Sequence, residues 1–231
     1  MGSSKQMSLQ GAVIAFDLDG TLVDTAPDLM GALNEVLAEH DLPPLPVASA
    51  RNLVGRGARA LIERGFAAAG RTLEPGQAPA LVERFISTYL GRIARESLPF
   101  EGLEPALDAL SALGARLAVC TNKRTDLSLA LLDALDLTSR FEAVIGSDMV
   151  AQKPDPRLLY LAIERAGGTR DRALFVGDSY VDHATARAAG VPIVGVSFGY
   201  VEEPLKPEDF DAMIDRYAEL PDLAERLIGR A

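Results

Sequence analysis

The chain has 231 residues, of which 48% are hydrophobic and 24% charged, a balance typical of a globular protein with a sizeable buried core. Its formal net charge of −10 argues against a surface for nucleic acids or anionic membranes, because such surfaces need basic patches. The single cysteine, Cys120, excludes an intramolecular disulfide and favours a reducing, cytoplasmic compartment. The sequence shows neither a membrane-length apolar segment nor a signal-peptide pattern, and residues 1–7 are expected to be a vector-derived leader.

Five apolar runs rich in β-branched residues predict buried strands. They are Ala12–Leu18, Arg116–Thr121, Ala143–Gly146, Ala173–Gly177 and Ile193–Ser197. Segments with helical periodicity lie between the last four runs, at Thr125–Leu137, Pro156–Gly167 and Asp182–Ala189. Strands that alternate with helices indicate right-handed βαβ units. We therefore expect an α/β fold, a Rossmann-like doubly wound parallel sheet with helices on both faces.

The connection between the first two strands is far too long for a simple crossover. It holds roughly ninety residues, whereas a crossover needs about a dozen. Apolar residues recur at helical spacing in four segments, Pro27–Glu39, Ala58–Ala69, Ala78–Arg95 and Glu104–Leu113. We expect an all-helical insertion over residues 25–95, after which the fourth helix returns the chain to the sheet. The C-terminal segment Pro207–Arg230 is expected to form short helices at the edge of the main domain.

The first predicted strand ends in Asp17-Leu18-Asp19-Gly20-Thr21. Residues two apart on a strand face the same side, so Asp17 and Asp19 would present their carboxylates to one spot. Two like charges held so close are costly unless a cation or a shared proton relieves them. Such pairs are tolerated mainly where they do chemistry. A polar turn is the alternative interpretation, since Asp, Gly and Thr are ordinary turn residues.

Polar residues also follow the other predicted strands. These are Thr121-Asn122-Lys123, Lys153-Pro154, and Gly177-Asp178 with Asp182 beyond it. In a doubly wound sheet, ligands bind outside the carboxyl ends of the strands, where these residues would meet. Carboxylate oxygens suit a hard cation such as Mg²⁺, while hydroxyl, amide and ammonium groups suit phosphate oxygens. Each residue alone could be a turn or solvated surface residue, but their joint placement indicates one site.

In this order the motifs resemble the four motifs of the haloacid-dehalogenase-like superfamily, and the resemblance spans nearly the whole chain. The insertion is similar to the cap domain of the small-cap branch, which makes residues 25–95 the cap and residues 8–24 and 96–231 the catalytic core. An acid at Asp19 implies the phosphatase branch, because the dehalogenases proper lack one there. Three further segments resemble the phosphoglycolate phosphatase subgroup, Asp24–Leu29, Thr121–Lys123 and Phe198–Tyr200. Two details depart from it: Thr25 replaces a common Ser, and Arg157 interrupts a Pro-rich stretch.

The resemblance implies a mechanism that residue chemistry can support. Asp17 would attack phosphorus to form an aspartyl-phosphate, and Asp19 would act as general acid and then as general base. Mg²⁺ would be held by a side-chain oxygen of Asp17, the backbone carbonyl of Asp19 and Asp178. Asp182 would support this metal site from behind without binding the ion. The ion would offset the repulsion between an anionic nucleophile and an anionic target.

The resemblance also implies how the substrate is held. Thr121, Asn122 and Lys153 would bind the phosphoryl oxygens, with Lys153 neutralising charge in the transition state. The insertion would close over the site and present side chains to the leaving group. Its candidate contact loop is Val54–Ala58, in which Arg56 could meet a substrate carboxylate. The alternative is a solvated arginine in a loop that precedes a helix.

The resulting expectation is a Mg²⁺-dependent phosphomonoesterase acting on a small phosphorylated metabolite, with 2-phosphoglycolate as the first candidate by resemblance. Other sugar or nucleotide phosphatases, and a β-phosphoglucomutase-like phosphoryl transferase, are alternatives within the enzyme class. A phospho-receiver signalling module is the alternative outside it, because it also places acids, a hydroxyl and a lysine on a parallel sheet. Neither nucleic acid nor membrane is expected as a partner, and the oligomeric state is left open.

Overall fold

The computed structural model describes residues 8–74, 76–200 and 205–228; the expected leader, residues 1–7, lies outside them. Within this part of the chain, six parallel strands form one sheet in the order β5-β4-β1-β6-β7-β8. In that order they are Ala143–Ile145, Arg116–Cys120, Val13–Phe16, Ala173–Gly177, Ile193–Val196 and Ala212–Ile214. The predicted Rossmann-like doubly wound sheet is thereby confirmed.

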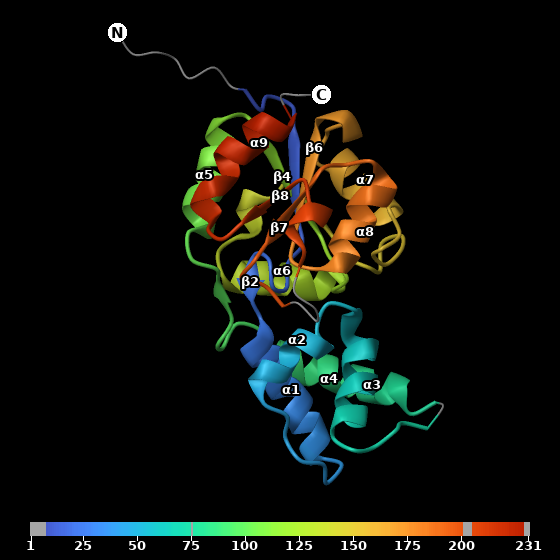
Figure 1. The fold of residues 1–231 in the computed structure, drawn as a ribbon. Coiled ribbons are helices and arrows are strands. Elements are labelled where there is room, and N and C mark those ends of the chain that lie inside the picture. Colours follow the sequence, from blue (N-terminus) through green and yellow to red (C-terminus); the bar gives the residue numbers. More distant parts are fainter. Residues whose placement is uncertain (1–7, 75, 201–204, 229–231) are drawn as a thin grey trace.

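Helices cover both faces of the sheet because each strand is apolar on both sides (Figure 1). On β1, Ile14 and Phe16 belong to the hydrophobic cluster of α5 and α9, while Val13 and Ala15 belong to that of α7 and α8. Neighbouring residues on a strand point to opposite faces, which explains this division. The helices of this part are α5 (Leu103–Ala112), α6 (Thr125–Ala134), α7 (Arg157–Arg165), α8 (Tyr180–Ala189) and α9 (Leu220–Ile228).

One strand of the sheet was not predicted. The segment Pro207–Arg230 was expected to form short helices, but Ala212–Ile214 adds to the sheet edge as β8, with Ala212 opposite Val194. Three residues are too short to establish a period of two, and Ala212 and Met213 are only half-buried. The described part of this segment does contain short helices, as expected. They are α9 and two 3₁₀ turns, Pro207–Asp209 and Tyr217–Glu219.

Four helices gather at the end of the sheet where its strands finish (Figure 1). They are α1 (Ala26–Ala38), α2 (Ala50–Leu53), α3 (Gly57–Ala68) and α4 (Ala78–Leu90). Their apolar stripes meet in a cluster of their own, which includes Leu33, Phe66 and Phe85 and also takes in Leu127 from α6. The expected helix over Ala78–Arg95 ends at Leu90, with Gly91 as its C-cap. The division of the chain into domains at residues 25 and 95 stays a prediction.

A two-stranded antiparallel pair, β2 (Val23–Asp24) with β3 (Leu98–Pro99), joins the four helices to the sheet. Next to it, the completely buried carboxylate of Asp28 accepts hydrogen bonds from Ser97 N and Oγ, both at 2.8 Å, and from Glu96 N at 2.9 Å. Arg92 lies 3.3 Å away, from Nε to Oδ1. Burial raises the pKa of Asp28, but these hydrogen bonds outweigh it and hold the pKa below its usual value.

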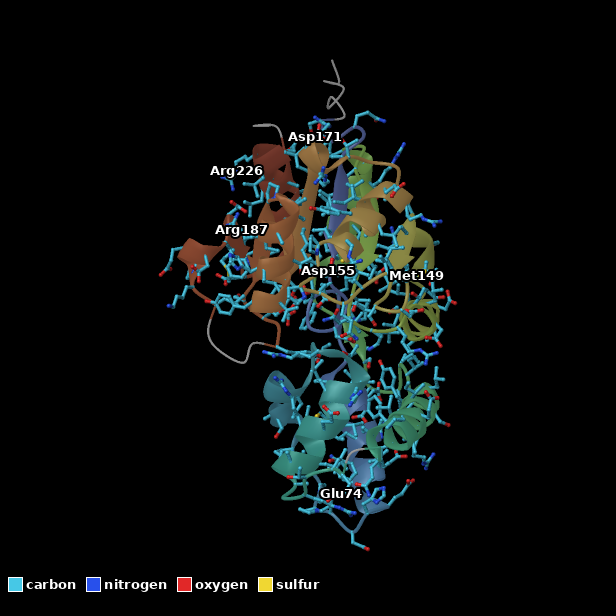
Figure 2. The ribbon with its side chains drawn as sticks, turned by 90° about the vertical axis from the view of Figure 1, so that its right-hand side faces the viewer. Glu74, Met149, Asp155, Asp171, Arg187 and Arg226 are labelled. Carbon is cyan, nitrogen blue, oxygen red and sulfur yellow. The ribbon has the colours of Figure 1, made fainter. Side chains whose placement is uncertain are left out.

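The molecule is elongated, as a view turned by 90° makes plain (Figure 2). Asp171, just before β6, lies at one end, and Glu74, between α3 and α4, lies at the other. Asp155 lies between them, near the level where the sheet meets the four helices. None of the described helices combines the length and apolar composition needed to cross a membrane.

We expect Asp28→Ala to lower the free energy of unfolding by about 3–5 kcal/mol, because it leaves Arg92 and two backbone donors without their buried partner. Glu35→Ala is the matched control, since it removes an exposed partner of the same arginine and should cost less than about 0.5 kcal/mol. Urea denaturation measures both variants. Equal losses of stability in the two variants would show that Asp28 does not hold together the two segments that join the helices to the sheet.

Candidate active site

The order of the strands brings the predicted site residues together. β1 lies between β4 and β6, so the segments that follow these three strands share one edge of the sheet. Asp17 follows β1, Thr121 follows β4, and Asp178 follows β6. The side chains of these three residues are all buried. The predicted convergence at the carboxyl ends of the strands is therefore present in the structure.

Lys153 is the centre of the charged cluster. Its ammonium lies 2.8 Å from Asp17 Oδ1 and 2.6 Å from Asp182 Oδ1, and its side chain is 1% exposed. Burial by itself would lower the pKa of Lys153, but the two carboxylates together outweigh burial and raise it. Lys153 is therefore a permanent cation beside the nucleophile candidate.

Asp182 is held by the start of α8. Its Oδ2 accepts hydrogen bonds from Ser179 N at 3.1 Å and Ser179 Oγ at 2.5 Å, a capping box at the helix N-terminus. Its other oxygen faces Lys153. Both oxygens of Asp182 thus have partners within the protein, one of them a cation. That Asp182 supports the metal site without binding the ion stays a prediction.

Asp178 lies close to Asp17 and Asp182. Its Oδ2 accepts a hydrogen bond from Tyr200 N at 2.6 Å, and its Oδ1 lies 3.3 Å from Thr21 Oγ1. Gly20 passes close by with φ +84°, a conformation that favours glycine. A Cβ at this position would lie 2.3 Å from Asp178 Oδ2, so any side chain here would displace the carboxylate.

The cluster buries more negative than positive charge. Asp17, Asp178 and Asp182 each offer a carboxylate oxygen, and these atoms lie within 4.8 Å of one another. Lys153 supplies one positive charge, so the ionised group carries two negative charges. Burial raises the pKa of Asp17 to about 6, with Lys153 opposing the shift, and burial together with Asp182 and Asp17 raises that of Asp178 well above normal. A divalent cation with oxygen ligands matches this deficit, so the residues fit Mg²⁺.

The carboxylate of Asp19 points to different partners. Lys123 Nζ lies 2.7 and 2.9 Å from its two oxygens, and Thr25 Oγ1 donates to Oδ1 at 2.7 Å. The metal role predicted for Asp19 needs only its backbone carbonyl and stays a prediction. Lys123 received no role from the sequence, although it is part of Thr121-Asn122-Lys123. The sequence feature that could have identified Lys123 is its position directly after a predicted strand, beside Thr121 and Asn122, which did receive roles.

Asn122 holds the backbone of Lys153. Its Oδ1 accepts from Lys153 N at 2.7 Å, and its Nδ2 lies 3.2 Å from Lys153 O and 3.2 Å from Gly55 O. The side chain of Asn122 therefore positions Lys153 and contacts the loop between α2 and α3. Thr121 Oγ1 accepts from Lys123 N at 3.2 Å. Direct phosphate binding by Thr121, Asn122 and Lys153 stays a prediction.

Tyr200 is another residue whose role the sequence missed, although Phe198-Gly199-Tyr200 stood out as a motif. Its hydroxyl contacts Asp24 Oδ1 and accepts a hydrogen bond from Ala26 N at 2.8 Å. Its backbone N–H binds Asp178, as described above. Tyr200 thus connects the carboxylate cluster with the first segment that leads into the four helices.

Two cavities open beside Asp19, between the sheet edge and the helices. One, of about 330 Å³, is lined by Arg56, Asp178 and Tyr200. The other, of about 200 Å³, is lined by Asp17, Lys123 and apolar side chains from α1, α4 and α6. Both include Asp19 and the loop at Val54 and Gly55. A small molecule in this space would contact the carboxylate cluster and the helices together.

The chain is similar to proteins of known family. It matches the model of haloacid dehalogenase-like hydrolases over residues 14–196. It is 58% identical over 214 residues to a phosphoglycolate phosphatase of Caulobacter vibrioides, covering 92% of this chain and 90% of that one.

Solved structures share the fold. A crystal structure of a predicted phosphoglycolate phosphatase from Haemophilus somnus 129pt superposes with a TM-score of 0.84 at 28% identity, covering 93% of this chain and 98% of that chain. CbbY from Rhodobacter sphaeroides, solved in complex with phosphate, gives a TM-score of 0.77 at 25% identity, covering 90% and 96%. These similarities confirm the resemblance found in the motifs.

The raised pKa of Asp17 predicts a pH-dependent stability of the metal-free protein. Burial raises the pKa of the native carboxyl group to about 6 from the 3.8 of an unperturbed aspartate, so ionising it lowers the free energy of unfolding as pH rises through this range. We expect Asp17→Asn to be more stable than the parent at pH 7.5 by on the order of 3 kcal/mol. Near pH 4 this difference in stability between the variant and the parent should disappear. Urea denaturation in EDTA measures the free energy of unfolding of both proteins, and a difference that does not change with pH would contradict the expectation.

Proposed function

The chain belongs to the haloacid dehalogenase-like hydrolase family, and on that premise we propose that it is a Mg²⁺-dependent phosphoric monoester hydrolase whose substrate is 2-phosphoglycolate. The observation that carries the proposal is the buried carboxylate of Asp17, which lines a cavity and lies 2.8 Å from the Lys153 ammonium. The relative from Caulobacter vibrioides, named phosphoglycolate phosphatase, supports the substrate. A cytoplasmic location is part of the proposal and agrees with one buried, unpaired cysteine, Cys120.

The metal ion would bind between β1 and β6. Side-chain oxygens of Asp17 and Asp178 and the backbone carbonyl of Asp19 would hold it, while Asp182 keeps Lys153 in place. When bound, Mg²⁺ supplies the positive charge that the cluster lacks and reduces repulsion between Asp17 and a phosphate. Tyr200 N and Thr21 Oγ1 orient Asp178 for this task.

In the first step, an oxygen of Asp17 attacks phosphorus and the bond between phosphorus and the leaving oxygen breaks. Lys153 lies against Asp17 and stabilises negative charge on the phosphoryl group as it transfers. Thr121 Oγ1 accepts from Lys123 N, so its own hydrogen is available for a phosphoryl oxygen. Asp19 gives its proton to the leaving alkoxide, which departs as an alcohol.

In the second step, water attacks the phosphorus of the aspartyl-phosphate. Asp19 takes a proton from that water, and the bond between Asp17 and phosphorus breaks to release inorganic phosphate. Lys123 and Thr25 hydrogen-bond to the carboxylate of Asp19 and so hold it in place for this role.

The four helices would select the substrate from their side of the cavity. The loop before α3 contacts the sheet edge through Gly55 O and Asn122 Nδ2, so a closed arrangement brings it over the site. Arg56 lines the larger cavity next to this loop. We keep Arg56 as the candidate specificity residue of this loop.

Two substitutions test the roles of the acids. Asp17→Asn should abolish phosphate release, because an amide cannot form the acyl-phosphate. Asp19→Asn should slow turnover by about a hundredfold or more and leave a phosphoryl group on the protein, detectable by intact mass, because no base activates the water. Asp155→Asn is the matched control, a half-buried acid near the same edge that pairs with Arg157 and should keep parental activity. Normal turnover by Asp19→Asn would exclude the acid–base role.

The substrate is tested by measuring phosphate release from a panel with and without Mg²⁺. We expect the highest kcat/KM for 2-phosphoglycolate, lower values for sugar and nucleoside monophosphates, and loss of activity in EDTA that Mg²⁺ restores. Isomerised hexose phosphate in place of free phosphate would indicate a phosphoryl transferase. Stable protein phosphorylation without turnover would indicate a receiver module. Either of these results would overturn the proposed function.

A further inference from the structure

Lys123 brings positive charge into the smaller cavity at the place where a leaving group would lie. Its side chain is 5% exposed, and its ammonium donates to both oxygens of Asp19, at 2.7 and 2.9 Å. An ammonium has three hydrogens, so a third donor exists beyond these two bonds. Burial lowers the pKa of Lys123, but Asp19 outweighs this effect and raises it, so the residue stays charged.

The other cations that line this cavity are committed elsewhere. Arg59 pairs with Glu63 at 2.8 Å on an exposed turn of α3, and Arg124 pairs with Asp126 at 2.8 Å at the start of α6. The arginine side chains are 75% and 45% exposed. Among the described residues that line the smaller cavity, Lys123 is therefore the one buried cation.

Tyr89 adds a second donor from α4. Its side chain is completely buried, its ring centre lies 4.7 Å from Lys123 Nζ, and it lines the same cavity. Its hydroxyl lies beside Lys123, and the hydroxyl hydrogen has no acceptor with hydrogen-bond geometry among the described residues. Burial raises the pKa of Tyr89 to about 12 although Lys123 opposes the shift, so the hydroxyl keeps its hydrogen. A buried hydroxyl hydrogen without an acceptor is costly, and a ligand acceptor would relieve that cost.

We propose that Lys123 and Tyr89 bind the carboxylate of the leaving group and so select a phosphorylated short-chain acid. This inference rests on the proposed function, which places the leaving oxygen next to Asp19. In 2-phosphoglycolate the carboxylate carbon is two covalent bonds from that oxygen. Lys123 is the cation hydrogen-bonded to Asp19, so it lies next to the place where the leaving oxygen and its carboxylate would be. The two donors, one charged and one neutral, match the two oxygens of one carboxylate.

The apolar part of the cavity wall agrees with a short acid. Leu29, Ile86 and Leu127 line it from α1, α4 and α6, and its volume is about 200 Å³. These apolar side chains offer no hydrogen-bond partners to the many hydroxyls of a sugar, which would be desolvated there at a cost. A two-carbon acid has no hydroxyl groups to bury against this apolar part of the wall.

The test compares two substrates that differ in the recognised group. These are 2-phosphoglycolate and ethylene glycol monophosphate, which carries a hydroxymethyl group in place of the carboxylate. The readout is the ratio of their kcat/KM values with Mg²⁺ present. Lys123→Met and Tyr89→Phe should each lower this ratio by about tenfold or more, because each removes a donor to a charged acceptor. A general loss of activity or of stability acts on both substrates and cancels in the ratio.

Arg124→Met is the matched control, because it also replaces a cationic side chain by methionine, at an exposed position of the same cavity. It should keep the parental ratio of kcat/KM values. An unchanged ratio in both Lys123→Met and Tyr89→Phe would overturn the inference, and a fall confined to Arg56→Met would place the carboxylate in the larger cavity instead. In both cases the parent would still hydrolyse phosphate esters. A parent inactive toward every ester with Mg²⁺ would instead overturn the proposed function, together with the inference that rests on it.

Discussion

The constraint on which the site depends is the surplus of buried negative charge at the carboxyl ends of β1 and β6. Lys153 balances part of it by lying between Asp17 and Asp182. Asp178 adds a further carboxylate to the same volume, and its raised pKa reflects burial and repulsion by its neighbours. Such a cluster costs stability in the absence of a cation, which is a common property of sites arranged for chemistry.

The neighbouring elements hold this cluster through the backbone as well as through side chains. Asn122 fixes both the N–H and the carbonyl of Lys153, and the backbone N–H of Tyr200 fixes Asp178. Gly20 lets the chain pass within contact distance of that carboxylate. Lys153 and Asp178 are therefore each oriented by a part of the chain distant in sequence, which limits their freedom before any substrate arrives.

The same residues connect the sheet with the four helices. Asn122 contacts Gly55, Asp19 accepts from Thr25, and Lys123 lies over the ring of Tyr89. The motif that follows β4 therefore contributes to phosphate binding and to leaving-group selection in our proposals. This arrangement would couple the choice of substrate to the position of Asp19, because Lys123 takes part in both.

The sequence by itself determined the α/β fold, the helical insertion and the residues that follow each strand, because long periodic segments and short polar motifs are local properties of the chain. It did not predict β8, whose three residues show no period, or the partners of Lys123 and Tyr200. Those partners come from segments far apart in sequence, and their distances depend on strand order and helix packing. Only the tertiary structure decided that Lys153 faces Asp17 and that Lys123 faces Asp19.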